Sequence, residues 1–156
     1  MIDEFRMIDK FPEELPDKHI VVFGSNTEGW HGSGLARDCK RLYGAEQHYG
    51  VGRQGQCYAI PTRERDPTKP APALQTMSLD KIYEYVQDFI QYAKDHKELT
   101  FLVSPIGCGH AGYSPKQIAP MFKNARYDWI KLPVEFNEIL DDYKKTIGDP
   151  EAQYEF

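Results

Sequence analysis

The sequence predicts an α/β fold in which helices cover both faces of a mixed, largely parallel sheet. Residues 20–23 and 100–103 are short apolar runs rich in β-branched and aromatic residues, which is typical of buried strands. Apolar residues recur at helical spacing elsewhere in the chain, most clearly across residues 79–96. Strands that alternate with helices are typical of layered α/β proteins.

The individual elements follow from the same patterns in chain order. A short edge strand is expected at residues 5–11, and Pro12 and Pro16 then break it. Ser78 and the pair Ser114-Pro115 are start signals for two of the helices. The remaining elements are expected as strands at 20–23, 57–60, 100–103 and 127–132, and as helices at 35–43, 79–96, 115–122 and from 133 onward.

Two stretches between these elements lack helix or strand periodicity. Residues 45–56 contain closely spaced glycines and are expected to form a hairpin-like loop. Residues 62–77 contain Pro67, Pro70 and Pro72, so we expect an exposed connection that begins where Pro61 closes the preceding strand. The charged run at 63–66 is interpreted as a solvated surface stretch.

Composition narrows the function classes. A chain of 156 residues with 40% hydrophobic and 13% aromatic content is expected to form one domain over residues 1–156, with roughly the first 17 residues and the tail from 148 at its periphery. No apolar run approaches the roughly 20 residues of a membrane span, and the N-terminus carries no signal-peptide pattern. Three cysteines without a Cys-x-x-Cys pair favour free thiols in a reducing cytoplasm. The net charge of −5, without a Lys/Arg run, argues against a nucleic-acid partner.

Two glycine-rich loops carry the functional signal. Residues 20–23 lead into a loop over 24–36 with glycines at 24, 29, 32 and 34, and residues 100–103 lead into a loop over 104–113 with glycines at 107, 109 and 112. Because glycine has no Cβ, its N–H can lie against a phosphate oxygen. Two such loops at the ends of neighbouring strands are expected to meet at one ligand site.

The arrangement of these loops resembles a macro domain. In that family an asparagine and a glycine-rich stretch follow one strand, and a second loop of the pattern Gly-x-Gly-x-x-Gly-Tyr/Phe follows a later strand. Here the corresponding segments are 26–34 and 105–113, within a similarity that extends from Val21 to Phe122. The same Gly-x-Gly-x-x-Gly pattern would suit a dinucleotide-binding Rossmann unit, but too little chain follows it for further β-α-β units. The resemblance, to a divergent bacterial or phage-type member, implies a three-layer α/β/α fold and ADP-ribose binding.

The resemblance also assigns roles to particular residues. It implies that Asn26 faces the distal ribose, that backbone amides of both loops hold the pyrophosphate, and that Tyr113 packs near the distal ribose. The implied ligand-binding set is Ser25, Asn26, Gly32, Ser33, Gly34, Ile106, Gly107, Cys108, Gly109, His110, Ala111, Gly112 and Tyr113.

Catalysis is a further expectation, with Asn26, His31 and His110 as the candidate catalytic residues. For Asn26 the structural alternative is a residue that only turns its loop. For His31 it is a solvent-facing turn residue, against a group that bonds the ribose or positions water. His110 is weighed in the same way, as a second polar group over the pyrophosphate. Cys108 is either a nucleophile with a stabilised thiolate or a small buried residue that lines the loop. A zinc site from His31, Cys108 and His110 has no recognised ligand spacing, and the interpretation requires no metal or other cofactor. Trp30 either stacks on a base or covers the loop.

The resemblance therefore implies binding of ADP-ribose or a related NAD-derived nucleotide, and it leaves hydrolysis of ADP-ribosyl linkages open. The first glycine run of this chain lacks the acid that many hydrolytic macro domains carry there. The alternative is a non-catalytic sensor or sponge that sequesters a nucleotide signal or docks on an ADP-ribosylated protein. A third hypothesis is an interaction protein whose glycines serve only tight turns.

Overall fold

The structure is a computed structural model that describes residues 11–147. Its sheet contains a parallel set formed by β1 (His19–Asn26), β3 (Cys57–Arg65), β5 (Thr100–Val103) and β6 (Ile130–Lys131). Two short strands, β2 (Gly52–Gln54) and β4 (Leu74–Thr76), pair antiparallel to β3. The strand order is β2-β3-β1-β5-β6, with β4 on the same outer edge of β3 as β2. The sheet is therefore mixed and largely parallel, as predicted.

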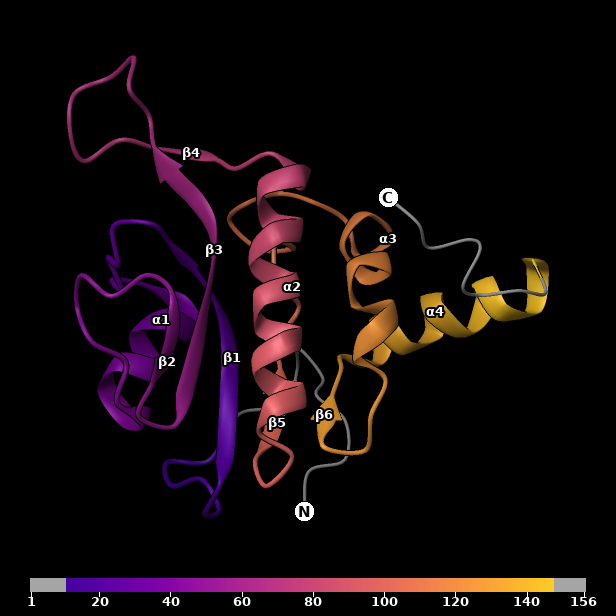
Figure 1. Ribbon diagram of the computed structural model, residues 1–156. Coiled ribbons are helices and arrows are strands. Elements are labelled where there is room, and N and C mark those ends of the chain that lie inside the picture. Colours follow the sequence, from indigo (N-terminus) through magenta and orange to yellow (C-terminus); the bar gives the residue numbers. More distant parts are fainter. Residues whose placement is uncertain (1–10, 148–156) are drawn as a thin grey trace.

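Helices cover both faces of this sheet. One face carries α1 (Gly34–Asp38), which continues as the π-helical turn η1 (Cys39–Tyr43). The other face carries α2 (Leu79–Asp95), α3 (Pro115–Ile118), the 3-10 helix η2 (Ala119–Ala125) and α4 (Val134–Ile147). Figure 1 shows α1 and α2 on opposite sides of β1. The predicted three-layer α/β/α arrangement is confirmed.

The central strand explains why an unbroken apolar run predicts burial on both sides. Along β1, Ile20 and Val22 pack into the core beneath α2, whereas Val21 and Phe23 pack into the core beneath α1. All four are fully buried. Because successive strand side chains point to opposite faces, a strand that is covered by helices on both faces has apolar residues at every position, whereas an alternating pattern is typical of a strand with one face in solvent.

The predicted end of the third strand at Pro61 is wrong. β3 continues through Pro61 to Arg65, and residues 74–76 return beside it as β4, so residues 62–77 form an extended hairpin rather than an open connection (Figure 1). Pro61 is tolerated because it lies opposite Ser25, where the register between β1 and β3 shifts before Asn26 pairs with Arg63. Such an irregularity interrupts the ladder where proline lacks its donor.

Smaller differences concern element boundaries. The strand expected at 127–132 is only the two residues of β6, because residues 127–130 form a turn in which the Ile130 N–H donates to the Tyr127 carbonyl oxygen at 3.1 Å. The rings of Tyr127 and Trp129 stack in this turn at 4.7 Å between centroids. The helix expected at 115–122 is a short α-helix followed by a 3-10 helix. Most of the edge strand expected at 5–11, and the tail from 148, lie outside the described residues. Over the described range, no helix has the length and apolarity of a membrane span.

Candidate functional site

A pocket of about 400 Å³ lies at the carboxyl ends of β1, β3 and β5. This end of a parallel sheet is where α/β proteins usually bind ligands. The residues that line it come from both glycine-rich loops, from the end of β3 and from β4. They are Gly24, Ser25, Asn26, Trp30, Gly32, Ser33, Gly34, Leu35, Ala36, Thr62, Arg63, Leu74, Ser104, Pro105, Ile106, Gly107, Gly109, His110 and Ala111.

Both loops present backbone N–H groups that the fold does not use. In the first loop, the amides of Gly32, Ser33 and Gly34 have no acceptor among the described residues. In the second loop, the same holds for the amides of Gly107, Gly109, His110 and Ala111. Backbone N–H groups are strong donors, and most of these residues are exposed, so their amides are accessible to a ligand. Two sets of unpaired donors on one pocket therefore form a site suited to an anion with several oxygen atoms.

Asn26 shapes the first loop from within. Its side-chain amide nitrogen donates to the carbonyl oxygen of Trp30 at 3.0 Å, and its side-chain oxygen accepts from the Trp30 N–H at 3.0 Å. This closes the loop over residues 26–30, which is the turn-forming role that asparagine often plays. Asn26 also lines the pocket, so one side chain both fixes the loop and borders the site.

The segment at 45–51 supports the first loop through two close backbone approaches. A Cβ on Gly29 would lie 2.3 Å from the backbone of His48 and Tyr49, and a Cβ on Gly50 would lie 2.0 Å from the Asn26 carbonyl oxygen. Only glycine fits where backbones meet this closely. The Ser25 hydroxyl also donates to the Gly50 carbonyl. The rim of the pocket is thereby set by contacts that a sequence pattern does not reveal.

His31 does not line the pocket. Its ring is 1% exposed and meets Phe23 edge-on at 5.3 Å, and its Nε2 lies 3.1 Å from the Tyr49 carbonyl oxygen. Burial lowers the pKa of His31 below 6.5, against an opposing effect of the nearby backbone acceptors. The solvent-facing position considered for His31 is therefore wrong, and its imidazole supports the first loop from beneath rather than bordering the site.

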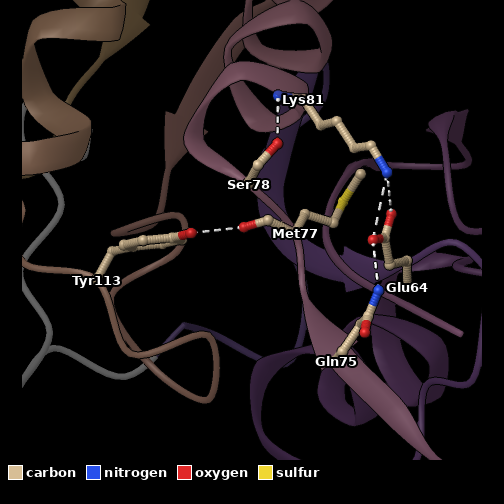
Figure 2. Close-up of polar contacts among 6 residues, drawn as sticks. All are labelled: Glu64, Gln75, Met77, Ser78, Lys81 and Tyr113. Carbon is tan, nitrogen blue, oxygen red and sulfur yellow. Dashed lines mark hydrogen bonds and ion pairs between the residues drawn. The ribbon is translucent and has the colours of Figure 1, made fainter. Parts of the chain in front are cut away.

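The second loop is held by its contacts with the connection between β4 and α2. The Tyr113 hydroxyl donates to the Met77 carbonyl oxygen at 2.6 Å (Figure 2), and the Thr76 hydroxyl donates to the Ala111 carbonyl oxygen at 3.1 Å. Tyr113 does not line the pocket. It fixes the position of the loop.

A polar cluster of Glu64, Gln75 and Lys81 joins the start of α2 to the β3–β4 hairpin. Lys81 Nζ lies 2.9 Å from the Glu64 carboxylate, and Gln75 donates to the same carboxylate at 2.9 Å (Figure 2). Lys81 and then Gln75 hold the pKa of Glu64 below its usual value. Ser78 caps α2 by accepting from the Lys81 N–H, as predicted. The hairpin and α2 are thus tied together beside the second loop.

Cys108 and Gly112 also lie outside the pocket lining. The Cys108 thiol is half-buried, and its sulfur lies 3.5 Å from the Ile106 carbonyl oxygen. Burial, with a smaller effect of the Glu135 carboxylate, raises the pKa of Cys108 to about 11. A nucleophilic cysteine needs a lowered pKa, so the nucleophile hypothesis for Cys108 is not supported. Within residues 11–147, no cluster of His, Cys, Asp or Glu side chains has the composition of a metal site.

The pocket includes residues that the sequence reasoning did not assign to it. Arg63, interpreted as part of a solvated surface stretch, lines the pocket, as do Thr62 and Leu74 from the same hairpin. The prolines in residues 62–77 favoured an exposed connection, so the extension of β3 that brings these residues to the pocket was not predicted. Residues 62–65 read Thr-Arg-Glu-Arg, which has no period-2 alternation of apolar and polar residues, so no local strand signal was available.

Comparisons with known proteins bear on the fold. No protein-family model and no curated protein matches the sequence significantly. Among solved structures, the chain is similar to the macrodomain of Mycobacterium tuberculosis DarG, at 16% sequence identity and a TM-score of 0.52, over 83% of this chain and 96% of that chain. The chain has a macrodomain-like fold. It is also similar to a Bacteroides thetaiotaomicron protein of unknown function, at 12% identity and a TM-score of 0.55, over 83% of this chain and 98% of that one. At these identities the macrodomain likeness concerns the fold.

Proposed function

We propose that the protein binds ADP-ribose, or a related NAD-derived nucleotide, in the pocket between its two glycine-rich loops. The observation that carries this proposal is the pair of unpaired amide sets, which includes Gly32, Ser33 and Gly34 on one side and Gly107, Gly109, His110 and Ala111 on the other. A pyrophosphate carries oxygen acceptors on both phosphorus atoms and can accept from two loops at once. The macrodomain-like fold supports the same ligand class.

The rest of the pocket suits the remainder of such a nucleotide. Leu35, Ala36, Leu74 and Ile106 supply apolar surface beside the amides, and the volume of about 400 Å³ falls within the range of roughly 300–1,000 Å³ that is usual for small-molecule sites. Apolar walls around a few convergent polar groups are the usual composition of a cofactor-sized pocket. An isolated phosphate would leave most of this surface uncovered.

The lining of the pocket favours binding without turnover over hydrolysis. Among residues 11–147, no Asp or Glu lines the pocket, so none of these carboxylates borders the site to activate water. Hydrolysis of an ADP-ribosyl linkage at the distal ribose would depend on His110, or on a phosphate of the ligand, to position the water, with Asn26 to orient the ribose. A sensor of a free nucleotide, or a module that docks on an ADP-ribosylated protein, requires only the amides.

Thermal unfolding with ADP-ribose, AMP and NAD tests the binding proposal. A ligand at 100 times its dissociation constant stabilises the folded state by about 2.7 kcal/mol, which raises the melting temperature by several degrees, at roughly 2–4 °C per kcal/mol for a chain of this size. We expect the largest shift with ADP-ribose and a smaller one with AMP, which lacks the pyrophosphate. Absence of a shift with all three nucleotides would overturn the proposal. Turnover of an ADP-ribosylated protein substrate then separates a hydrolase from a binding module.

A further inference from the structure

Arg63 lies in β3 between β1 and β4. In the sheet it pairs with Asn26 of β1 on one side and with Thr76 of β4 on the other. The Thr27 N–H donates to the Arg63 carbonyl oxygen at 2.9 Å, and the hydroxyl of Thr76 donates to Ala111 in the second loop. Arg63 is therefore bonded directly to the first loop and linked to the second loop through Thr76, and it lines the pocket between them.

The guanidinium of Arg63 is only partly satisfied by the protein. One terminal nitrogen donates to the Leu74 carbonyl oxygen at 3.2 Å, and the buried Nε has no hydrogen-bond partner. No carboxylate among residues 11–147 pairs with this side chain. A guanidinium has five N–H donors in a planar fork, so most of the donors of Arg63 remain unused.

Arg65, two residues further along the same strand, shows the contrasting arrangement. It donates to the Ala73 carbonyl oxygen at 2.8 Å and forms an ion pair with Glu28 at 3.7 Å. Both arginines thus anchor a carbonyl of the hairpin, but only Arg65 has a protein counter-ion and only Arg63 lines the pocket. A half-buried arginine without a carboxylate is unusual, because desolvated charges are normally paired.

Arg63 also stands out by its charge among the residues that line the pocket. The chain carries a net charge of −5, yet in the part of the chain that the structure describes the pocket is lined by one basic residue, Arg63, and by no acidic one. Arginine binds phosphate in a bidentate geometry. It also stays protonated at all accessible pH values and so cannot act as a base or nucleophile. Its chemistry is therefore that of an anion-binding residue.

We propose that Arg63 is the specificity-determining residue of this pocket and that its guanidinium donates to a phosphate oxygen of a nucleoside diphosphate held by the two loops. The inference rests on the proposed function, because it assumes a nucleotide in the pocket. It adds that the site selects ligands by the charge of the diphosphate, and that this selection depends on one side chain as well as on the loop amides.

The test is calorimetric titration of ADP-ribose and AMP into the wild-type chain and three variants. Arg63→Gln removes the charge, Arg63→Lys keeps the charge without the planar fork, and Arg65→Gln removes the matched charge that lies outside the pocket. We expect Arg63→Gln to weaken ADP-ribose binding roughly tenfold to a hundredfold. The ratio between the affinities for ADP-ribose and for AMP should become smaller than in the wild-type chain. The loss of ADP-ribose affinity between 50 and 300 mM NaCl should also be smaller in this variant than in wild type. Arg63→Lys should lose less, and Arg65→Gln should bind within about twofold of wild type.

The outcomes separate the two proposals. If the wild-type chain binds ADP-ribose and Arg63→Gln retains both its affinity within threefold and its preference over AMP, the role of Arg63 is refuted and the pocket stands. If Arg63→Gln and Arg65→Gln weaken binding equally, the arginines act through the hairpin and the inference fails. If the wild-type chain binds neither nucleotide, the proposed function fails and the inference falls with it. Should Arg63→Gln unfold, wild-type affinity and selectivity in Arg63→Lys would still refute recognition by the planar fork.

Discussion

Substitution of Gly109 by valine tests whether the loop amides hold a phosphate. Gly109 lines the pocket, its N–H has no acceptor among the described residues, and a Cβ added there would meet no atom within 4 Å. Its backbone is not in the left-handed region, so an L-residue introduces no strain. Gly109→Val therefore places a branched side chain beside the free amide without disturbing the packing of the fold.

The expected loss can be worked from the contacts. A valine beside this amide displaces the phosphate from at least two charged hydrogen bonds, each worth about 1.5 kcal/mol. The sum of about 3 kcal/mol corresponds to a loss of affinity of more than a hundredfold. Away from packing contacts, surface substitutions stay within about 0.5 kcal/mol, so the melting temperature without ligand should move by no more than about 2 °C.

The assay is titration of ADP-ribose into wild type, Gly109→Ala and Gly109→Val, with the melting temperature of each free protein as the folding control. Alanine adds only the Cβ and should give a smaller loss than valine. Gly32→Val repeats the test on the first loop, where a Cβ also meets no atom within 4 Å. A folded Gly109→Val protein that binds ADP-ribose within threefold of wild type would refute the phosphate-loop reasoning.

Three further predictions concern the groups around the pocket. Tyr113→Phe removes the hydroxyl that donates to Met77; we expect a loss of about 1 kcal/mol of stability, seen as a fall of roughly 2–4 °C in melting temperature, and no change would contradict the anchoring role. Because burial holds the pKa of His31 below 6.5, its neutral form is favoured by folding, so stability should decline as pH falls below 6.5. His31→Gln should show a shallower decline between pH 7.5 and 5, and equal slopes would argue against that burial. With the pKa of Cys108 near 11, about one thiol in a thousand is ionised at pH 8, against about a quarter of free cysteines; alkylation should be correspondingly slow, and labelling as fast as free cysteine would restore the nucleophile hypothesis.

The parts of the fold that the sequence predicted are those with a strong local signal. The strands at 20–23 and 100–103 were predictable because residues buried on both faces of a sheet cannot be polar. The helix at 79–96 was predictable from its apolar spacing and from the Ser78 cap, and its observed range is Leu79–Asp95. The two glycine loops followed because each comes directly after one of these strands.

The parts that escaped prediction depend on contacts between distant segments. Pro61 signalled the end of a strand, but a register shift opposite Ser25 accommodates it and lets β3 reach Arg63. His31 looked like an exposed loop residue, yet the segment at 45–51 covers it. Neither the shift nor the covering segment leaves a local sequence pattern, so the side wall and the underside of the pocket required the three-dimensional structure.

The roles of the residues around the pocket limit the chemistry that the protein can perform on a ligand. Side chains that a macro-domain resemblance would turn toward the ligand are used to shape the loops: Asn26 bonds to the backbone of Trp30, and Tyr113 bonds to Met77. In the proposed complex, recognition would be left to backbone N–H groups and to Arg63, groups that donate hydrogen bonds and neutralise phosphate charge. None of them can take a proton from water, since the amide N–H and the guanidinium act only as donors. A site built in this way can bind a nucleotide while leaving its glycosidic bond intact. By the same reasoning, a hydrolytic activity would have to use His110, among the described residues that line the pocket, or a phosphate of the ligand to position the water.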